Sequence, residues 1–468
     1  MIDPSTPGTP DWWLDRLATR LGDGFPRLGR LRAHWLGEAP VPDGGGEAMR
    51  AAYRRFKDLA RLNVAELIAE AVTSRMVPAG FKTSTADDDE GDREAMARWT
   101  ANHMGVQARD LFTDMAVYGC GYLRVSGDDG ALSVPSPWLT AVEPVPARPW
   151  ESSAALLAGW DAQAGEDCLL LWWQDDAGVW ARLAARPGRV SSIPDSGQRW
   201  SPSRSWEWAG GPERVGLSRV PVVACRAKKG LGQFERHLAA LDRINHTIFQ
   251  RLAITVMQAF RQRWISGDLP DEYPEGHPQA GRKIDYEDIF KSGPAAMWRL
   301  PFGAKVEESA YTDVTPLLTA VKDELRQLAA VSQTPLYLLD PDAATGSAAG
   351  ASASRETLVF KVEDLCARAG DALATAMALS FEASGGRRDD IEVVWKPADR
   401  ASLSEKAQAA SQAAGSLPRR TIWREIWQMT PDRFAQAEQD AADEAFEETR
   451  RAARDEAAAG GRQPGQTQ

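Results

Sequence analysis

The segment from Gln233 to Phe381 restricts the fold more than any other part of this sequence. It contains an amphipathic helix, an insert rich in Pro and Gly, a second amphipathic helix, a loop of small residues and a third helix. Residues 233–264 predict about 48 Å of helix at roughly 1.5 Å per residue. Its apolar residues recur every three or four positions and so share one side: Phe234, Leu238, Leu241, Ile244, Ile248, Leu252, Val256, Phe260 and Trp264. This order favours a channel lined by a ring of subunits over an active site.

The insert over residues 266–309 separates the two amphipathic helices. Met297–Leu300 and Lys305–Val306 are typical of short strands, so we expect a small α/β tip. Thr315 followed by Pro316 predicts the start of the second helix, because a capping hydroxyl and a first-turn proline both favour it. The apolar side of that helix consists of Val314, Leu318, Val321, Leu325 and Leu328. The two helices should form an antiparallel pair.

Residues 340–354 contain only Asp, Pro, Ala, Thr, Gly and Ser. No large side chain can anchor this segment in a core, so it is predicted to be a surface loop. A flexible linker has the same composition, but regular helical spacing resumes directly after it at Leu358, Val362, Leu365, Ala369, Leu373, Met377 and Phe381. Asp340 and Asp342 could be a pair of metal-binding carboxylates, and turn formation explains them at least as well.

The rest of the chain is predicted to be helical at both ends and β-rich in the middle. Residues 1–46 should form a partly mobile arm with one short helix near Trp12. Apolar spacing predicts one helix over 47–76 and another over 93–118. Residues 122–227 alternate between strand and turn patterns, and the lone strand Ile391–Trp395 is expected to pair with them.

The β-rich region holds nine of the 18 tryptophans, between Trp138 and Trp208. Such rings could form a sugar-binding platform, but a thin sheet core or a subunit interface is the favoured interpretation. After the lone strand, helix-start patterns at Ser402, Pro418 and Pro431 predict a helical C-terminal module, followed by a disordered tail over 457–468.

Composition and motifs argue against several functions. The net charge is −11, which is unlike a tight DNA-binding protein. The four cysteines and five histidines are scattered, which predicts neither a zinc site nor a disulfide framework. The sequence contains no GxxxxGK[ST] loop, no HExxH motif and no GxSxG elbow, so we expect no enzyme activity, no metal and no cofactor. No apolar run approaches the roughly 20 residues of a membrane span.

Several motifs occur in an order that resembles the portal proteins of tailed bacteriophages with long non-contractile tails. They are Pro221–Val223, Leu241–Asn245, Arg261–Arg263 and Thr334–Leu338, followed by the small-residue loop. The resemblance covers residues 47–431. Where many relatives carry an Asn and a Gly-Arg-Ser-like stretch, this chain has Arg226–Gly232.

This resemblance implies an α+β, mainly helical portal fold that assembles as a ring, typically of twelve subunits. Its parts would be an N-terminal arm (1–46), a wing (47–229 and 386–400), two stem helices (230–265 and 310–333), a clip (266–309), a tunnel loop (334–354), a tunnel helix (355–385), a helical crown (401–456) and the tail.

The resemblance also implies roles for individual residues. The DNA channel would contain Asp340, Asp342, Thr345, Gly346, Ser347, Gly350, Ser352 and Ser354. Stem packing would use Leu241, Ile244, Ile248, Leu252, Leu318, Val321, Leu325 and Leu328. The clip would contact motor and adaptor through Asp271, Glu272, Arg282, Lys283, Asp285 and Lys291.

The function implied is passage of double-stranded DNA into and out of a phage head. The expected partners are DNA without sequence preference, the terminase large subunit, a head-tail adaptor, and the major capsid and scaffolding proteins, with no membrane. The protein would be assembled in the bacterial cytoplasm and reside in the virion. The tryptophan-rich region leaves a receptor- or carbohydrate-binding tail protein as the alternative, and a DNA-processing enzyme as a second rival.

Overall fold

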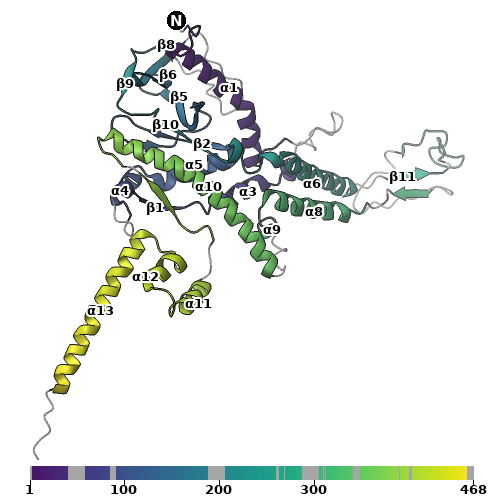
Figure 1. Cartoon of the computed structure of the whole chain (residues 1–468). Coiled ribbons are helices and arrows are strands. Elements are labelled where there is room, and N and C mark those ends of the chain that lie inside the picture. The colour runs from purple at the N-terminus through teal and green to yellow at the C-terminus, as the bar shows by residue number, and fades with distance from the viewer. Residues whose placement is uncertain are drawn as a thin grey trace, which may run out of the picture. The chain divides into compact units, whose positions relative to one another are not determined.

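The computed structural model describes residues 3–40, 58–84, 91–187, 206–259, 263–267, 269–286, 305–308, 310, 312–340, 348–388, 390–399 and 403–460. It contains two compact units. The larger comprises Met1–Pro40, Leu62–Asp242 and Glu324–Gln468, and the smaller comprises Val41–Arg61 and Arg243–Asp323. The unit boundaries therefore fall inside the two predicted stem helices. Helices and strands are mixed, as the sequence predicts (Figure 1).

The core of the larger unit forms around the long helix α10 (Ala348–Ala383), which packs against β10 (Val222–Arg226) and β2 (Cys120–Val125). β2 lies between β10 and β3 (Leu132–Ser133) in an antiparallel sheet, within the region predicted to be rich in strands and turns. Helix α5 (Met104–Tyr118) packs against β2. The apolar side of α10 is fully buried in this cluster at Leu358, Val362, Leu365, Ala369, Leu373, Met377 and Phe381.

A second, six-stranded sheet contains most of the predicted β-rich region (Figure 1). Its antiparallel path is β4 (Thr140–Val145), β5 (Arg148–Asp161), β6 (Glu166–Asp175), β7 (Gly178–Pro187) and β8 (Glu207–Trp208), and β9 (Glu213–Val215) also pairs with β7. Trp172, Trp173 and Trp206 are buried, whereas Trp150 is 60% exposed. The buried rings agree with a role in the sheet core.

The predicted N-terminal arm is wrong, because residues 10–35 form one long helix. Helix α1 (Pro10–Trp35) begins at the cap Thr9, whose hydroxyl accepts a hydrogen bond from the Trp12 amide at 3.3 Å, and it packs against β4, β5 and β6. Gly22, Gly24 and Pro26 lie inside this helix, although glycine and proline disfavour helical structure. The buried stripe of Leu14, Leu17, Leu21, Phe25, Leu28 and Leu31 outweighs those local preferences.

Two helices that were predicted to be continuous are interrupted. Residues 61–63 leave the helical path, and Asn63 caps a new helix, α3 (Val64–Thr73). Helix α4 (Arg93–Ala101) ends before His103, which has a φ of 53°, and α5 then begins. The Asn102 side chain accepts a hydrogen bond from the Leu132 amide at 2.9 Å. Polar side chains that bond the backbone compete with the helix at both places.

The lone strand was predicted to pair with the 122–227 region, and that pairing is wrong. Strand β13 (Glu392–Trp395) is antiparallel to β1 (Pro78–Lys82), a strand that the sequence reading missed. β1 is short and contains a proline, an alanine and a glycine, so it lacks the β-branched residues that mark strands. Its register is fixed by pairs such as Phe81 with Val393.

The smaller unit contains the ends of the two helices and the insert between them. Helix α6 (Leu238–Ala259) is shorter than predicted, because Trp264 lies in strand β11 (Arg263–Ser266) instead. β11 pairs with β12 (Lys305–Glu308), which confirms the predicted Lys305–Val306 strand. Helix α8 (Thr315–Ser332) begins where Thr315 and Pro316 predict. Met297–Leu300 lies outside the described residues.

Among the described residues, three α-helices follow β13. They are α11 (Leu403–Ala413), α12 (Arg419–Thr421), which continues into a π-helical turn over Ile422–Ile426, and α13 (Pro431–Gly460). The predicted helix starts are confirmed. The tail was predicted to begin at residue 457, but α13 extends to Gly460, and residues 461–468 lie outside the described residues. The Ala-rich end of α13 explains this extension.

Asp114 on α5 yields a prediction about pH. Its burial, and then the charge of Asp110, raise the pKa of this carboxyl to about 8. The folded chain therefore keeps a proton that the unfolded chain loses near pH 4. The free energy of unfolding should fall by up to about 1.4 kcal/mol per pH unit between pH 4 and pH 8. Asp114→Asn should remove this part of the slope and be more stable than wild type at pH 8. Urea denaturation at pH 5, 6.5 and 8 measures it.

The exposed Asp176→Asn is the matched control for that measurement and should keep the wild-type slope. Equal slopes for wild type and Asp114→Asn would contradict the assignment of a proton to Asp114 in the folded chain.

Candidate functional site

The reversal of the chain between α8 and α10 is fixed by a helix cap and a buried amine. Gln333 adopts a φ of 55°, and the Thr334 amide donates to the Ala329 carbonyl at 2.9 Å, as in a Schellman motif. The Lys361 ammonium donates to the Ser332 carbonyl at 2.9 Å. These contacts hold the end of α8 against the side of α10, which sets where the small-residue segment begins.

The segment proposed to approach DNA is only partly described. Helix α9 (Leu336–Leu339) is followed by Asp340, which is half-buried. Asp342, Thr345, Gly346 and Ser347 lie outside the described residues. Gly350, Ser352 and Ser354 lie in the first turns of α10, so the expectation that the loop extends to residue 354 is wrong. The helix begins at Ala348 because the segment is rich in alanine, the strongest helix former.

The predicted stem residues divide into a buried and a more exposed set. Leu241, Ile244, Leu325 and Leu328 are buried within the chain, at 9% exposure or less. Ile248, Leu252 and Val321 are half-buried, and Leu318 is 40% exposed. In the smaller unit, Ile248 and Leu252 pack on Phe249 and Ala60, and the Gln258 side chain donates to the Thr312 carbonyl at 2.8 Å. Leu318 therefore leaves part of the stripe exposed among the described residues.

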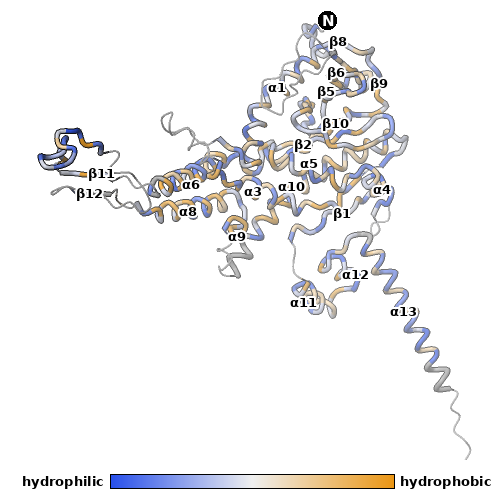
Figure 2. The backbone as a smooth tube through the Cα atoms, turned by 180° about the vertical axis from the view of Figure 1, so that it is seen from behind, coloured by the Kyte–Doolittle hydropathy of each residue, from blue (hydrophilic) through white to orange (hydrophobic). Residues whose placement is uncertain are grey.

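The predicted clip residues lie on a hydrophilic turn that follows β11 (Figure 2). Asp271, Glu272, Arg282, Lys283 and Asp285 are all exposed. The backbones of Glu272 and Lys283 form an isolated antiparallel β-bridge. Tyr273 stacks on His277 with ring centroids 4.4 Å apart, and the Tyr286 hydroxyl donates to the Pro270 carbonyl at 2.6 Å. The turn thus presents charges of both signs on an ordered backbone. Lys291 lies outside the described residues.

Lys361 is a residue that the sequence reading missed. Its side chain is largely buried, and burial lowers its pKa to about 8. Burial, followed by the charges of Lys361 and Arg236, also lowers the pKa of His237. The sequence does indicate this burial, because Lys361 lies three residues after Leu358 and four before Leu365, on the apolar side of the helix.

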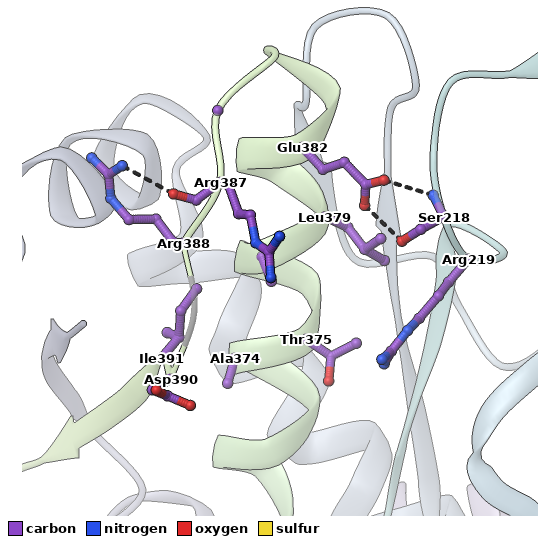
Figure 3. A pocket seen from close by; sticks show the side chains of 12 residues that line it. Ser218, Arg219, Ala374, Thr375, Leu379, Glu382, Arg387, Arg388, Asp390 and Ile391 are labelled. Atoms are coloured by element: carbon purple, nitrogen blue, oxygen red, sulfur yellow. Dashed lines mark hydrogen bonds between the residues drawn. The ribbon is translucent and has the colours of Figure 1, made fainter. Parts of the chain in front are cut away.

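A polar cavity of about 610 Å³ lies along the second half of α10 (Figure 3). Arg387 and Arg219 extend toward the helix from two different loops, and Thr375 lies between them. The Glu382 carboxylate accepts hydrogen bonds from the Ser218 amide at 2.8 Å and from its hydroxyl at 2.9 Å. The described residues that line this cavity include no histidine, cysteine or lysine.

The described residues offer few other candidate sites. Within the described ranges, no group of three or more His, Cys, Asp or Glu residues is arranged to hold a metal ion. The helices of the described residues also include none that is long and apolar enough to span a membrane. Cys225 and Cys366 are buried, while Cys120 and Cys168 are half-buried, and all four are free thiols.

Comparison with known proteins identifies the class. Residues 195–455 match the family described as phage portal protein, SPP1 Gp6-like, and that match spans more than half of the chain. The chain therefore belongs to this family of structural phage proteins, which confirms the resemblance seen in the sequence. Phage portal proteins are components of the virion.

Individual relatives agree with the family. The portal protein of Mycobacterium phage D29 is 23% identical over 384 residues, which is 76% of this chain and 73% of the relative. The portal protein of Mycobacterium phage L5 is 22% identical over 390 residues, with the same shares of 76% and 73%.

Two similar solved structures come from necks of GTA particles. A chain of the neck of an empty GTA particle, computed with C6 symmetry, has a TM-score of 0.43 and 16% identity, covering 86% of this chain and 98% of the other. A chain of the neck of a native GTA particle, computed with C12 symmetry, has a TM-score of 0.40 and 14% identity, with coverage of 86% and 98%.

Proposed function

We propose that this protein forms a portal ring of twelve subunits through which double-stranded DNA enters and leaves a phage head. The observation that carries the proposal is membership of the portal family over residues 195–455. The paired helices, exposed turn and small-residue segment occur in the order that a channel-lining subunit requires. In this role the protein is a structural component and not an enzyme.

The chemistry of the small-residue segment suits a conduit. Residues 340–354 carry no Lys, Arg or aromatic side chain. They offer neither cations that would release counterions from phosphates nor rings on which bases could stack. The net charge of −11 per chain, repeated around a ring, would further oppose adhesion of DNA. A moving duplex could pass such a surface without being held.

The exposed turn after β11 is proposed to dock the terminase motor during packaging and the head-tail adaptor afterwards. Its exposed charges include Asp271, Glu272, Arg282, Lys283 and Asp285. Exposed charges of both signs favour specific and reversible association over permanent adhesion. That property fits a surface that exchanges one partner for another. Major capsid and scaffolding proteins would surround the ring at the capsid vertex.

Imaging of the purified full chain tests this function. Negative-stain electron microscopy should show closed rings with an axial opening, and symmetry analysis of the end views should give the subunit number. A trimeric fibre that binds glycans would instead support the receptor-binding alternative, which the burial of Trp172, Trp173 and Trp206 disfavours.

Stem packing gives a more specific prediction. Leu241 and Leu325 are buried within the chain, so a charge there would disturb folding itself. Leu318 is 40% exposed, and Leu318→Asp should leave the folded chain intact while weakening ring assembly by about 1–3 kcal/mol per interface. Sedimentation velocity together with circular dichroism separates the two effects.

Leu403→Asp, at a position that is 77% exposed on α11, is the matched control and should assemble normally. Wild-type assembly of Leu318→Asp would count against a packing role for this part of the stem.

A further inference from the structure

A second cavity, of about 580 Å³, lies between the end of α8, the first half of α10 and the segment that precedes α6. We name it the α8–α10 groove and define it by Lys228, Arg236, Val331, Phe360 and Lys361, which are among its lining residues. All of these residues belong to the larger unit of the chain. The groove is distinct from the small-residue segment and from the turn after β11.

The groove exposes two large apolar side chains. Val331 and Phe360 are each 62% exposed, although they lie on helices whose other sides are buried. Scattered exposed apolar residues are ordinary, but two that line one hollow form a patch that gains free energy when it is covered. The groove therefore has an apolar part available for contact.

The groove is also positively charged, in contrast to the chain as a whole. Lys228, Arg236 and Lys361 line it, whereas the lining carboxylate of Asp364 is bound to Arg368 at 3.0 and 3.1 Å. Among the described residues, no carboxylate lies within ion-pairing distance of the Lys361 ammonium, and the hydrogen bond found for it goes to the Ser332 carbonyl. A largely buried ammonium without an anion is costly, and an incoming carboxylate would relieve that cost.

The same side of α10 continues beyond the groove. Lys361, Arg368, Thr375 and Glu382 recur every seven residues and so lie on one side of the helix. The last two line the cavity of Figure 3. These positions span about 32 Å at roughly 1.5 Å per residue, which is a length typical of a protein–protein contact.

We propose that the α8–α10 groove is a docking site for a second copy of this chain, which inserts an apolar side chain against Phe360 and Val331 and places a carboxylate opposite Lys361. Charge complementarity selects this occupant, because the groove is cationic and a second copy carries a net charge of −11. The inference rests on the proposed ring and locates one of its contacts. Duplex DNA fits less well, since phosphates make no use of an apolar patch.

Paired substitutions test the apolar part of the groove. Phe360→Ser and Val331→Ser should each raise, at least tenfold, the concentration at which half of the protein is assembled. A change of that size is expected for contact residues near the centre of an interface. Phe446→Ser and Val106→Ser are matched controls, because both side chains are 68% exposed and neither lines the groove. The controls should stay within twofold of wild type. Native mass spectrometry over a dilution series gives these concentrations.

Lys361→Met tests the charged part. The variant removes a largely buried cation but also its hydrogen bond to the Ser332 carbonyl, and these two effects oppose each other, so the unassembled chain should unfold within a few degrees of the wild-type temperature. Assembly should nevertheless weaken at least tenfold. A purely structural role for Lys361 predicts the reverse, a lower unfolding temperature with unchanged assembly. Hydroxyl-radical labelling adds a direct readout, in which oxidation of Phe360 should fall at least fivefold on assembly while oxidation of Phe446 does not change.

Each contrary outcome has a distinct meaning. Wild-type rings together with normal rings from all three groove variants would overturn the docking site and leave the proposed function standing. Normal rings that lose affinity for duplex DNA would show that the groove binds nucleic acid instead. A wild-type chain that stays monomeric at every concentration would overturn both proposals.

Discussion

A chain that lacks Thr345–Ala351 is expected to form rings of normal size and to fail to package or retain DNA. The deleted residues are Thr, Gly, Ser and Ala only, so they contribute little to any apolar core. The described part of the deletion is the first turn of α10, and Leu358 is the first buried residue among those of the helix whose burial is described. The folded body should therefore tolerate the change.

The measurement is the yield of DNA-filled heads when the deletion variant replaces the wild-type chain, with ring formation followed by electron microscopy. Deletion of Gly210 and Gly211, which lie in a turn between β8 and β9, is the control and should leave packaging unchanged. Normal yields from the Thr345–Ala351 deletion would show that this segment is not the part of the chain that acts on DNA.

Gly119→Ala should destabilise the chain by at least about 3 kcal/mol, because strain and a backbone collision occur together. Gly119 ends α5 with a φ of 81°, and a Cβ atom there would lie 2.3 Å from the Gly230 carbonyl oxygen. Neither backbone can move freely, since the Ala227 amide donates to the Gly119 carbonyl at 3.0 Å and Arg27 donates to the Gly230 carbonyl at 3.0 Å.

Gly165→Ala separates strain from collision. Gly165 has a φ of 69° with nothing within 4 Å of the added carbon, so that variant should lose only about 1 kcal/mol. Urea denaturation of the three chains gives the comparison. If Gly119→Ala and Gly165→Ala lose equal stability, the close approach of α5 to the segment before α6 has no energetic importance.

Periodic patterns made the central helices predictable. The apolar side of α10 is buried at every position that the spacing named, and α8 begins where a cap and a proline mark it. Strong alternation and turn residues similarly revealed the large sheet. These elements follow from local sequence because the same residues that favour the element also bury its apolar side.

The failures occurred where tertiary contacts overrule local signals. Helix α1 contains Gly22, Gly24 and Pro26, and only its buried leucines reveal it. The partner of β13 could not be deduced, because β1 is poor in strand-forming residues and lies more than 300 positions earlier in the chain. The interruptions at Asn63 and Asn102 depend on hydrogen bonds made by those side chains. Lys361 escaped notice because its importance lies in burial, which composition does not reveal.

Photo-crosslinking inside the assembled particle tests the central claim most directly. A photoreactive phenylalanine derivative at Thr345, in the segment proposed to approach DNA, should crosslink to double-stranded DNA in filled heads and not in empty ones. The control carries the same photoreactive derivative in place of Phe446, which is 68% exposed on α13. DNA crosslinked at position 345 well above the level at position 446 is the result that the account predicts. Crosslinks to protein alone at position 345 in DNA-filled heads would contradict it.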